Sequence, residues 1–390
     1  MSNTIDFFNT IVILGVIQGI LSAIAVGYYS SPVFSKKLLS AILLTLAFLG
    51  IKILLHTLGL WQHPNLHYFP LAIDTLIQPL FYLYICCLTE EKFSFKQKTL
   101  WHFAPVLIFQ VHAILVYIVT LSQTNIHSKD HIAEQYLYYN AVKWIEDILV
   151  LFSSGIYWYL SFQKVQKYRH WLFTSQSATQ YSELKWLRNL LFGTGLLITV
   201  LFLSSLPANI LQYKNSFPYL QIFYGYLTIL IYFLSFQGYH TLLASKMQVF
   251  RMPQKSISEI DLPDIEIKTI ENQENFQDIL SALTEVMEKQ FLFMEPELNL
   301  KDLSRPIGFP TSQVSSVINT GFGLNFRGWV NSYRVEEVKK RLNDPAYKQL
   351  SLTGIAYECG FNSEASFYRI FRQHTGYSPK TYLQKLKSRH

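Results

Sequence analysis

Three ionisable residues, Lys52, Asp74 and Glu146, lie in separate long apolar stretches of the sequence. A charged side chain in a hydrocarbon environment is costly and usually faces a partner or a water-filled cavity. His56 follows Lys52, and Gln78 follows Asp74, at the four-residue spacing that puts two side chains on one face of a helix. The set predicts either a polar pocket or a structural tie between helices, and the sequence alone leaves both open.

The sequence contains seven apolar segments, at about 8–28, 38–59, 69–89, 100–121, 140–162, 188–210 and 217–239. The second, third and fifth of them carry the three ionisable residues. Each approaches the ~20 residues that a helix needs to cross a hydrocarbon core of about 30 Å. We therefore expect a seven-helix membrane domain over residues 1–245. Depths counted at about 1.5 Å per residue place the three charges in one layer near the outer face.

The lysines and arginines of the connecting loops indicate how this domain is oriented. Ten lie in the loops after the first, third and fifth segments, whereas the opposite loops hold only Lys129 and Lys214. Positive loops stay in the cytoplasm. The pattern predicts an external N-terminus and a cytoplasmic C-terminus.

The C-terminal quarter differs from the rest in charge. Between Pro296 and His390 there are 14 lysines and arginines against seven acids, and the remainder of the chain is neutral. Such a basic region indicates a polyanionic partner, either DNA or anionic lipid. The cysteines and histidines lack metal-ligand spacing, and we find no phosphate loop or catalytic constellation. The sequence therefore predicts no enzyme activity, no cofactor and no metal site.

Two connecting segments precede the basic region. Residues 246–274 have no clear helical period and are predicted to form an acidic linker. Residues 275–295 form an amphipathic connector helix with an apolar stripe at three- and four-residue spacing: Phe276, Ile279, Leu280, Leu283, Val286, Met287 and Phe291. This helix either packs on the C-terminal domain or mediates dimerisation.

Closely spaced helical patterns fill residues 296–390. They run over Leu300–Ile307, Ser312–Asn319, Phe326–Leu342, Leu352–Cys359 and Glu364–Thr375. The last two are separated by a short turn containing Gly360, which is typical of a helix-turn-helix, whose second helix enters the DNA major groove. Asn362 or Ser363 supplies the N-cap of that second helix.

The region from about Leu298 to Leu386 resembles the AraC/XylS family of transcription regulators, in its membrane-bound form. The matching residues are Asn331-Ser332-Tyr333-Arg334-Val335-Glu336-Glu337, Ile355-Ala356-Tyr357, Gly360-Phe361, Phe367, Arg369, Phe371, Gly376, Ser378-Pro379 and Tyr382. The resemblance implies two helix-turn-helix units joined by a long central helix. The expected fold class is thus all-α, a seven-helix membrane bundle followed by a double helix-turn-helix domain.

The resemblance also assigns DNA-contacting residues. Bases are expected to be read by Thr311, Ser312, Gln313 and Ser316 in the first unit, and by Ser363, Glu364, Ala365, Tyr368 and Arg369 in the second. Arginine pairs with guanine and glutamine with adenine in the major groove. Phosphate contacts are expected from Lys339, Lys340, Arg372 and Lys380. The first unit departs from the family pattern at Pro306 and Pro310. Pro306 removes a backbone hydrogen bond where it lies inside a helix. Pro310 stands where the family usually has an N-capping serine.

Together these patterns predict a one-component transcriptional regulator in a bacterial cytoplasmic membrane. The expected partners are double-stranded promoter DNA, the lipid bilayer, RNA polymerase, a second copy of the chain, and an unidentified small-molecule or envelope stimulus. The alternative is a receptor- or transporter-like membrane protein whose basic C-terminal domain is an interaction module.

Overall fold

The computed structural model describes residues 7–28, 34–90, 93–177, 184–195, 217–243 and 273–388. Every regular element in these residues is a helix, so the expected all-α class is confirmed for this part of the chain. The chain divides into two compact units, Met1–Val165 with Trp186–Lys246, and Gln166–Lys185 with Met247–His390. The predicted linker, 246–274, lies almost entirely outside the described residues.

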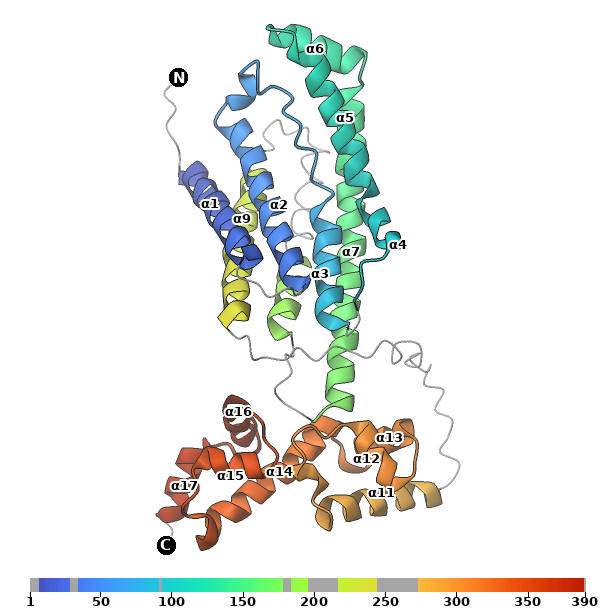
Figure 1. The fold of residues 1–390 in the computed structure, drawn as a ribbon, viewed down its shortest axis with the longest axis vertical. Coiled ribbons are helices and arrows are strands. Elements are labelled where there is room, and N and C mark those ends of the chain that lie inside the picture. Colours follow the sequence, from blue (N-terminus) through green and yellow to red (C-terminus); the bar gives the residue numbers. More distant parts are fainter. Residues whose placement is uncertain are drawn as a thin grey trace. The chain divides into compact units, whose positions relative to one another are not determined.

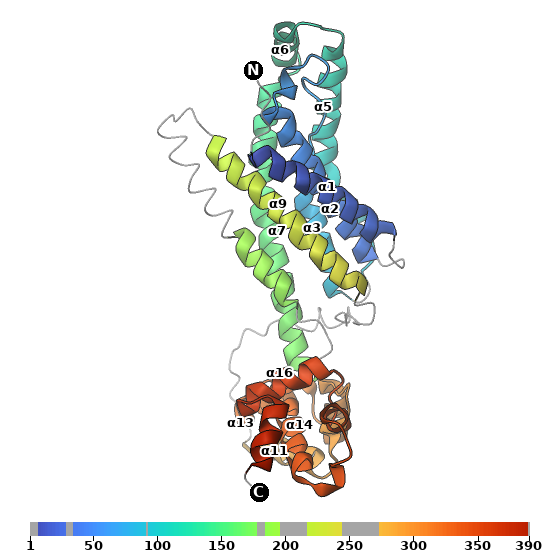
Figure 2. The same ribbon diagram turned by 90° about the vertical axis from the view of Figure 1, so that its left-hand side faces the viewer.

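The first unit contains the apolar helices. They are α1 (Phe7–Tyr28), α2 (Phe34–Thr57), α3 (Ile77–Thr89), α4 (Gln97–Leu100), α5 (Ala104–Leu121), α6 (Ile126–Gln135), the first part of α7 (Tyr139–Ser175) and α9 (Phe217–Leu243), with 3₁₀ turns at Leu60–Gln62 and Trp101–Phe103. Helices α1 and α2 pack against each other and against α9, side by side in both views (Figures 1 and 2). Close packing of α1 on α2 and α9 is possible because Gly15 and Gly19 present no side chain to their neighbours.

Three described helices are long and apolar enough to cross a membrane: Phe7–Tyr28, Phe34–Thr57 and Gln97–Leu121. They correspond to the first, second and fourth expected segments. The fifth expected segment falls within α7 and the seventh within α9. Much of the sixth, from residue 196 onward, lies outside the described residues.

The third expected segment, 69–89, is a helix only from Ile77, so that prediction was wrong over residues 69–76. This stretch is instead held in a non-helical path by Gln110 of α5. Its amide donates to the Pro70 carbonyl at 2.8 Å and accepts from the Ala72 N–H at 3.1 Å. Asp74 consequently lies in the turn before α3 rather than one helical turn from Gln78.

The second unit contains the remaining elements. They are α11 (Gln273–Glu288), α12 (Leu300–Ile307), α13 (Thr311–Phe322), α14 (Phe326–Asn343), α15 (Leu352–Glu358), α16 (Glu364–Thr375) and α17 (Pro379–Lys387), with 3₁₀ turns at Leu292–Met294 and Pro345–Tyr347. The long helix α14 lies between two groups of helices (Figure 1). Its first half, with Trp329, closes one hydrophobic core, and its second half, with Val338, closes another.

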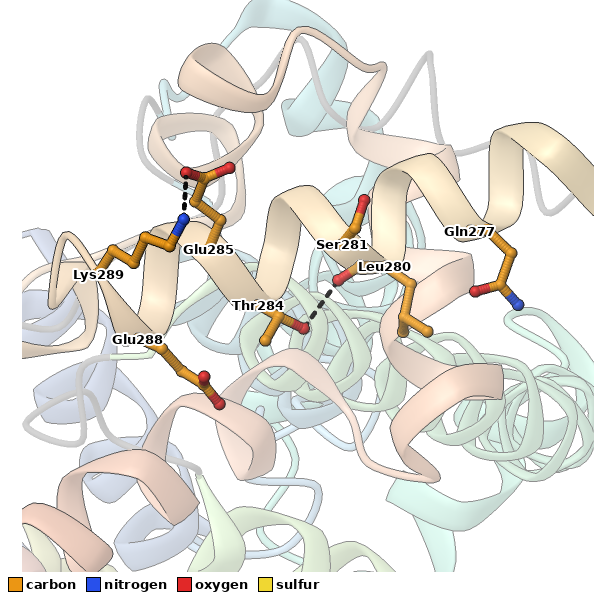
Figure 3. Close-up of a pocket in the computed structure, with 7 residues that line it drawn as sticks. All are labelled: Gln277, Leu280, Ser281, Thr284, Glu285, Glu288 and Lys289. Atoms are coloured by element: carbon orange, nitrogen blue, oxygen red, sulfur yellow. Dashed lines mark hydrogen bonds and ion pairs between the residues drawn. The ribbon is translucent and has the colours of Figure 1, made fainter.

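The apolar stripe of α11 is buried in the first of these cores. Ile279, Leu283, Val286 and Met287 pack there with residues of α12 to α14. The outer side of α11 carries a groove lined by residues of this helix and by Lys289 directly after it, which forms an ion pair with Glu285 at 3.1 Å (Figure 3). The stripe is therefore used inside the chain, which favours the packing role over dimerisation through this face.

Candidate nucleic-acid interface

Two helix–turn–helix pairs stand on either side of the middle of α14. In the first, Gly308 joins α12 to α13 with a φ of 78°, and in the second, Gly360 joins α15 to α16 with a φ of 88°. Positive φ is readily adopted only by glycine, since other residues meet a steric penalty there. The turn that the sequence predicted at Gly360 is thus explained, and the same device recurs at Gly308.

Helix α16 presents its polar face outward. The Ser363 side chain caps the helix by accepting from the Ser366 N–H at 3.5 Å. Phe367, Ile370 and Phe371 are buried in the second core. The other face carries the residues expected to contact DNA; Glu364, Ala365, Arg369 and Arg372 are exposed, and Tyr368 is half-buried.

Helix α13 is built on the same plan with different chemistry. Val314, Val317 and Ile318 are buried in the first core. The expected base-reading residues Thr311, Ser312, Gln313 and Ser316 are all exposed. The helix begins at Thr311, the preceding Pro310 provides no side-chain cap, and the helix contains no lysine or arginine.

Pro306 does not break α12, which continues to Ile307. The proline lies one residue before the helix end, and the Gly308 N–H closes the helix by donating to the Ser304 carbonyl at 3.0 Å. The cost of a missing backbone bond is smaller near a helix end than in its middle, because terminal groups are satisfied by caps or water.

The expected phosphate-contacting residues differ in their surroundings. Lys339 is paired with Glu336 of its own helix at 2.8 Å, so it is partly neutralised. Lys340 is 76% exposed, with Glu337 3.8 Å away. Lys380 and Arg372 are also exposed. Lys340 therefore offers a freer charge to a phosphate group than Lys339 does.

Arg334, at the centre of α14, belongs to the sequence motif that resembles the AraC/XylS family, and the sequence alone assigned it no role. Arg334 is 0% exposed. Its Nε donates to the Phe293 carbonyl and its Nη2 to the Glu295 carbonyl, each at 2.7 Å. Burial lowers the pKa of Arg334 to about 9, so the side chain still carries its charge at neutral pH.

Gly360 lies against the same group of atoms. A side chain at this position would come within 2.7 Å of the Phe293 and Met294 carbonyls and 2.9 Å of Arg334 Nε. Arg334 thus joins the segment before α12 to the turn of the second helix-turn-helix unit. These contacts link residues about 40 positions apart, and no local sequence pattern reveals them.

In the first unit, the structure brings together the charges that the sequence singled out. Lys52 forms an ion pair with Asp74. Lys143 of α7 lies 3.6 Å from Asp74, 2.9 Å from Glu146 and 3.1 Å from Asp147. Sequence analysis did not single out Lys143 as a partner of Asp74, because its three- and four-residue spacing from Glu146 and Asp147 indicates pairing within its own helix only.

The other expected members of this layer have different partners. Gln78 donates to Ser154 Oγ at 3.0 Å, and His56 stacks on the Trp61 ring at 4.6 Å between centroids. Glu146 is buried, and its Oε1 atom has no hydrogen-bond partner among the described residues. His56 therefore does not join the charge cluster through a hydrogen bond or ion pair recorded in the described part of the chain.

Known proteins are similar to this chain in its C-terminal region. A family described as a helix-turn-helix domain matches residues 303–385. An uncharacterized HTH-type transcriptional regulator of Staphylococcus aureus strain MSSA476 is 34% identical over 91 residues, which make up 23% of this chain and 12% of that protein. The uncharacterized HTH-type transcriptional regulator YtdP of Bacillus subtilis strain 168 is 25% identical over 113 residues, 29% of this chain and 14% of that protein.

The matches thus cover about an eighth of the length of these curated relatives. No solved structure matches the chain. With its two helix–turn–helix pairs, the C-terminal region is a helix-turn-helix domain of the kind found in transcriptional regulators. More particularly, it is a domain of the AraC type, as the sequence motifs implied.

Proposed function

We propose that this chain is a membrane-bound one-component transcriptional regulator, in which α16 reads promoter DNA and the N-terminal helices sense a stimulus. The observation that carries the proposal is the exposed polar face of α16, with Glu364, Ala365 and Arg369, on an AraC-type domain. In the part of the chain that the structure describes, three helices are long and apolar enough to span a bilayer. RNA polymerase and a second copy of the chain are the further partners of this proposal.

Genome-wide mapping of the intact protein tests the DNA-binding part. We expect occupancy at a defined set of promoters sharing a sequence motif, and Arg369→Ala should abolish most of it at equal protein abundance. The absence of any shared motif would favour the alternative, a receptor- or transporter-like protein with an interaction module.

Lipid contact is supported by the surface of α5. Leu107, Ile108, Val111 and Ile118 are each more than 60% exposed on this helix. Contiguous apolar surface of this kind marks an interface with lipid or protein. Reporter fusions after Lys98 should be cytoplasmic, as should those after Lys246, whereas a fusion after Lys129 should be external. An external signal at Lys246 would contradict the seven-span topology with its cytoplasmic DNA-binding domain.

The layer of Lys52, Asp74, Lys143 and Glu146 is the proposed sensory site. Removing one member of a buried ion pair costs about 3–5 kcal/mol, and less where water enters. A change of that size shifts the populations of a two-state domain. Lys52→Met or Asp74→Asn should therefore lock promoter output in one state while the protein still accumulates in the membrane. Normal, inducible output from both variants would reduce the layer to a structural tie.

The double variant Lys52→Met with Asp74→Asn separates a tie from a pocket. A structural pair predicts that the double variant regains inducible output, since no charge is left unpaired. A ligand pocket predicts that the double variant accumulates in the membrane but does not respond to the stimulus.

A further inference from the structure

The C-terminal end of α7 belongs to the same compact unit as the helix-turn-helix pairs. Gln176 and Asn299, just before α12, form an antiparallel β-bridge. The neighbouring Ser177 N–H donates to the Leu298 carbonyl at 3.0 Å. Gln176 is 8% exposed and Ser177 is 0% exposed. The segment after α7 is therefore embedded in the unit rather than lying on its surface.

Two side-chain contacts add to this backbone pairing. The Ser177 hydroxyl donates to the Leu298 carbonyl and accepts from Arg334 Nη2 at 3.2 Å. The guanidinium carbon of Arg327, near the start of α14, lies 5.4 Å from the centroid of the Phe173 ring. Ser177 is thus the third oxygen ligand of the buried guanidinium that also holds the Phe293 and Glu295 carbonyls.

We propose that Ser177 and Arg334 are positioning residues for DNA binding, and that docking of the α7 end holds the two helix-turn-helix units in a fixed mutual geometry. This geometry lets each unit bind its own stretch of base pairs, its half-site, on one DNA duplex. The inference rests on the proposed function. Arg334 contacts the segment before α12 on one side and the turn at Gly360 on the other. A group bonded to Arg334 therefore acts on the contact between the two helix-turn-helix units.

The docked segment leaves the reading surface open. Gln313 of α13 and Glu364 and Arg369 of α16 remain exposed in the structure. A segment that blocked DNA would bury these side chains. The docked arrangement is therefore compatible with DNA binding, and under the proposal release of the segment should weaken binding.

Helix α7 is also the element that carries the charge layer. Lys143 and Glu146 lie in its first turns, and the helix continues without a break to Ser175, two residues before Ser177.

The test uses the full chain in lipid vesicles and a duplex that the wild type has enriched from random-sequence DNA. Binding is measured to this duplex and to one with a single extra base pair between its half-sites, which displaces one half-site by about 3.4 Å. The variants are Ser177→Ala and, as a matched control, Thr174→Ala. Among the described residues, the Thr174 hydroxyl bonds only to the His170 and Trp171 carbonyls of its own helix.

For the wild type and Thr174→Ala, the extra base pair should reduce affinity on the order of tenfold, equivalent to about 1.4 kcal/mol. Ser177→Ala should bind the unmodified duplex several-fold more weakly and lose most of the penalty for the extra base pair. A general loss of folding would lower both affinities without changing their ratio. An unchanged ratio in Ser177→Ala, or a wild type indifferent to the extra base pair, would overturn the proposal.

A cross-link provides a second measurement on the same contact. Partners in an antiparallel bridge are close enough for a disulfide. Adding Gln176→Cys with Asn299→Cys to Ser177→Ala should restore the spacing penalty under oxidising conditions and lose it on reduction, with Asn299→Cys alone as the control for the lost α12 cap. An oxidised protein that stays indifferent to spacing contradicts the proposal. Failure of the wild type to enrich any sequence would instead contradict the proposed function.

Discussion

The two helix-turn-helix units close their turns with glycines of similar backbone conformation but in different surroundings. A methyl group at Gly308 would meet no atom within 4 Å. At Gly360 it would lie 2.7 Å from two backbone carbonyls and close to Arg334. The first turn is therefore an exposed corner, whereas the second is packed into the joint of the domain.

The reading helices differ in the same direction. Helix α16 has the Ser363 cap and carries Arg369 and Arg372, while α13 starts at an uncapped Pro310 and has no cation. The two units thus share a fold, but the exposed faces of α13 and α16 differ in charge and in capping. Under the proposed function, we expect the second helix-turn-helix unit to supply most of the base discrimination and the first mainly to hold the domain on the DNA.

Replacing the two glycines tests the difference in packing, and has the largest expected effect. Gly360→Ala should destabilise the second helix-turn-helix unit by about 3 kcal/mol or more, since left-handed backbone strain of about 1–2 kcal/mol adds to overpacking of about 1–3 kcal/mol. Gly308→Ala, the matched control, should cost only about 1 kcal/mol, from the strain less the reduced entropy of the unfolded chain. Hydrogen exchange of the amides in 311–322 and 352–375 measures both. Equal losses at the two positions would remove the distinction between an open and a packed turn.

Substitution of one exposed residue on each reading helix tests the difference in chemistry. Arg369→Ala should weaken specific binding by about 1–3 kcal/mol and relax the preference at one base position. Gln313→Ala should cost less, at most about 1 kcal/mol, because a hydrogen bond from a neutral amide contributes less than one from a charged group. Binding of the full chain to systematically varied duplexes gives both values. A larger loss from Gln313→Ala would reverse the assignment of the two units.

The two lysines of α14 separate phosphate contact from base reading. Lys340→Ala should weaken binding to all sequences alike and lower the salt dependence of log K by about one unit of slope. Lys339→Ala should have a smaller effect, because Glu336 already pairs with Lys339. Titrations at several salt concentrations distinguish them. A change in sequence preference from Lys340→Ala would make it a base contact.

The smallest expected effect comes from giving the first unit the cap of the second. Pro310→Ser adds an N-cap contributing about 1 kcal/mol but removes the proline that restricts the unfolded chain by about 0.4–1 kcal/mol. The net gain in stability of α13 should be a few tenths of a kcal/mol, measured by hydrogen exchange of residues 311–322. A net loss would mean that Pro310 matters more for the turn than a cap does.

Local patterns predicted the elements of the reading domain closely. The expected helix Glu364–Thr375 is reproduced at both ends, because a capping serine precedes it and Gly376 follows in the left-handed region. Helix α13 continues to Phe322 rather than Asn319, since its stop signal is Gly323 with a φ of 65°. The residues expected to contact DNA are exposed on both helices, apart from Ser363 and Tyr368, which are partly buried, because helical periodicity determines which face is buried.

Long-range contacts account for what the sequence did not predict. The start of α3 at Ile77 depends on bonds from Gln110, about 40 residues away, to the preceding segment. The bond between Arg334 and Ser177 joins residues separated by 157 positions. Apolar composition predicted the three described helices that are long enough to cross a membrane, but it does not show where a distant polar side chain, such as Gln110, holds the chain in a non-helical path.

Because it includes residues 166–185, the C-terminal compact unit of the chain is discontinuous in sequence, with residues 186–246 inserted between its parts. Such a domain is not a transferable cassette. A chimera that grafts residues 273–388 onto a foreign membrane anchor would retain both reading helices, α13 and α16. It would leave behind Phe173, Gln176 and Ser177, and with them the partners of Arg327, Asn299 and Arg334. Domain exchange in this protein therefore has to carry the end of α7 together with the C-terminal helices.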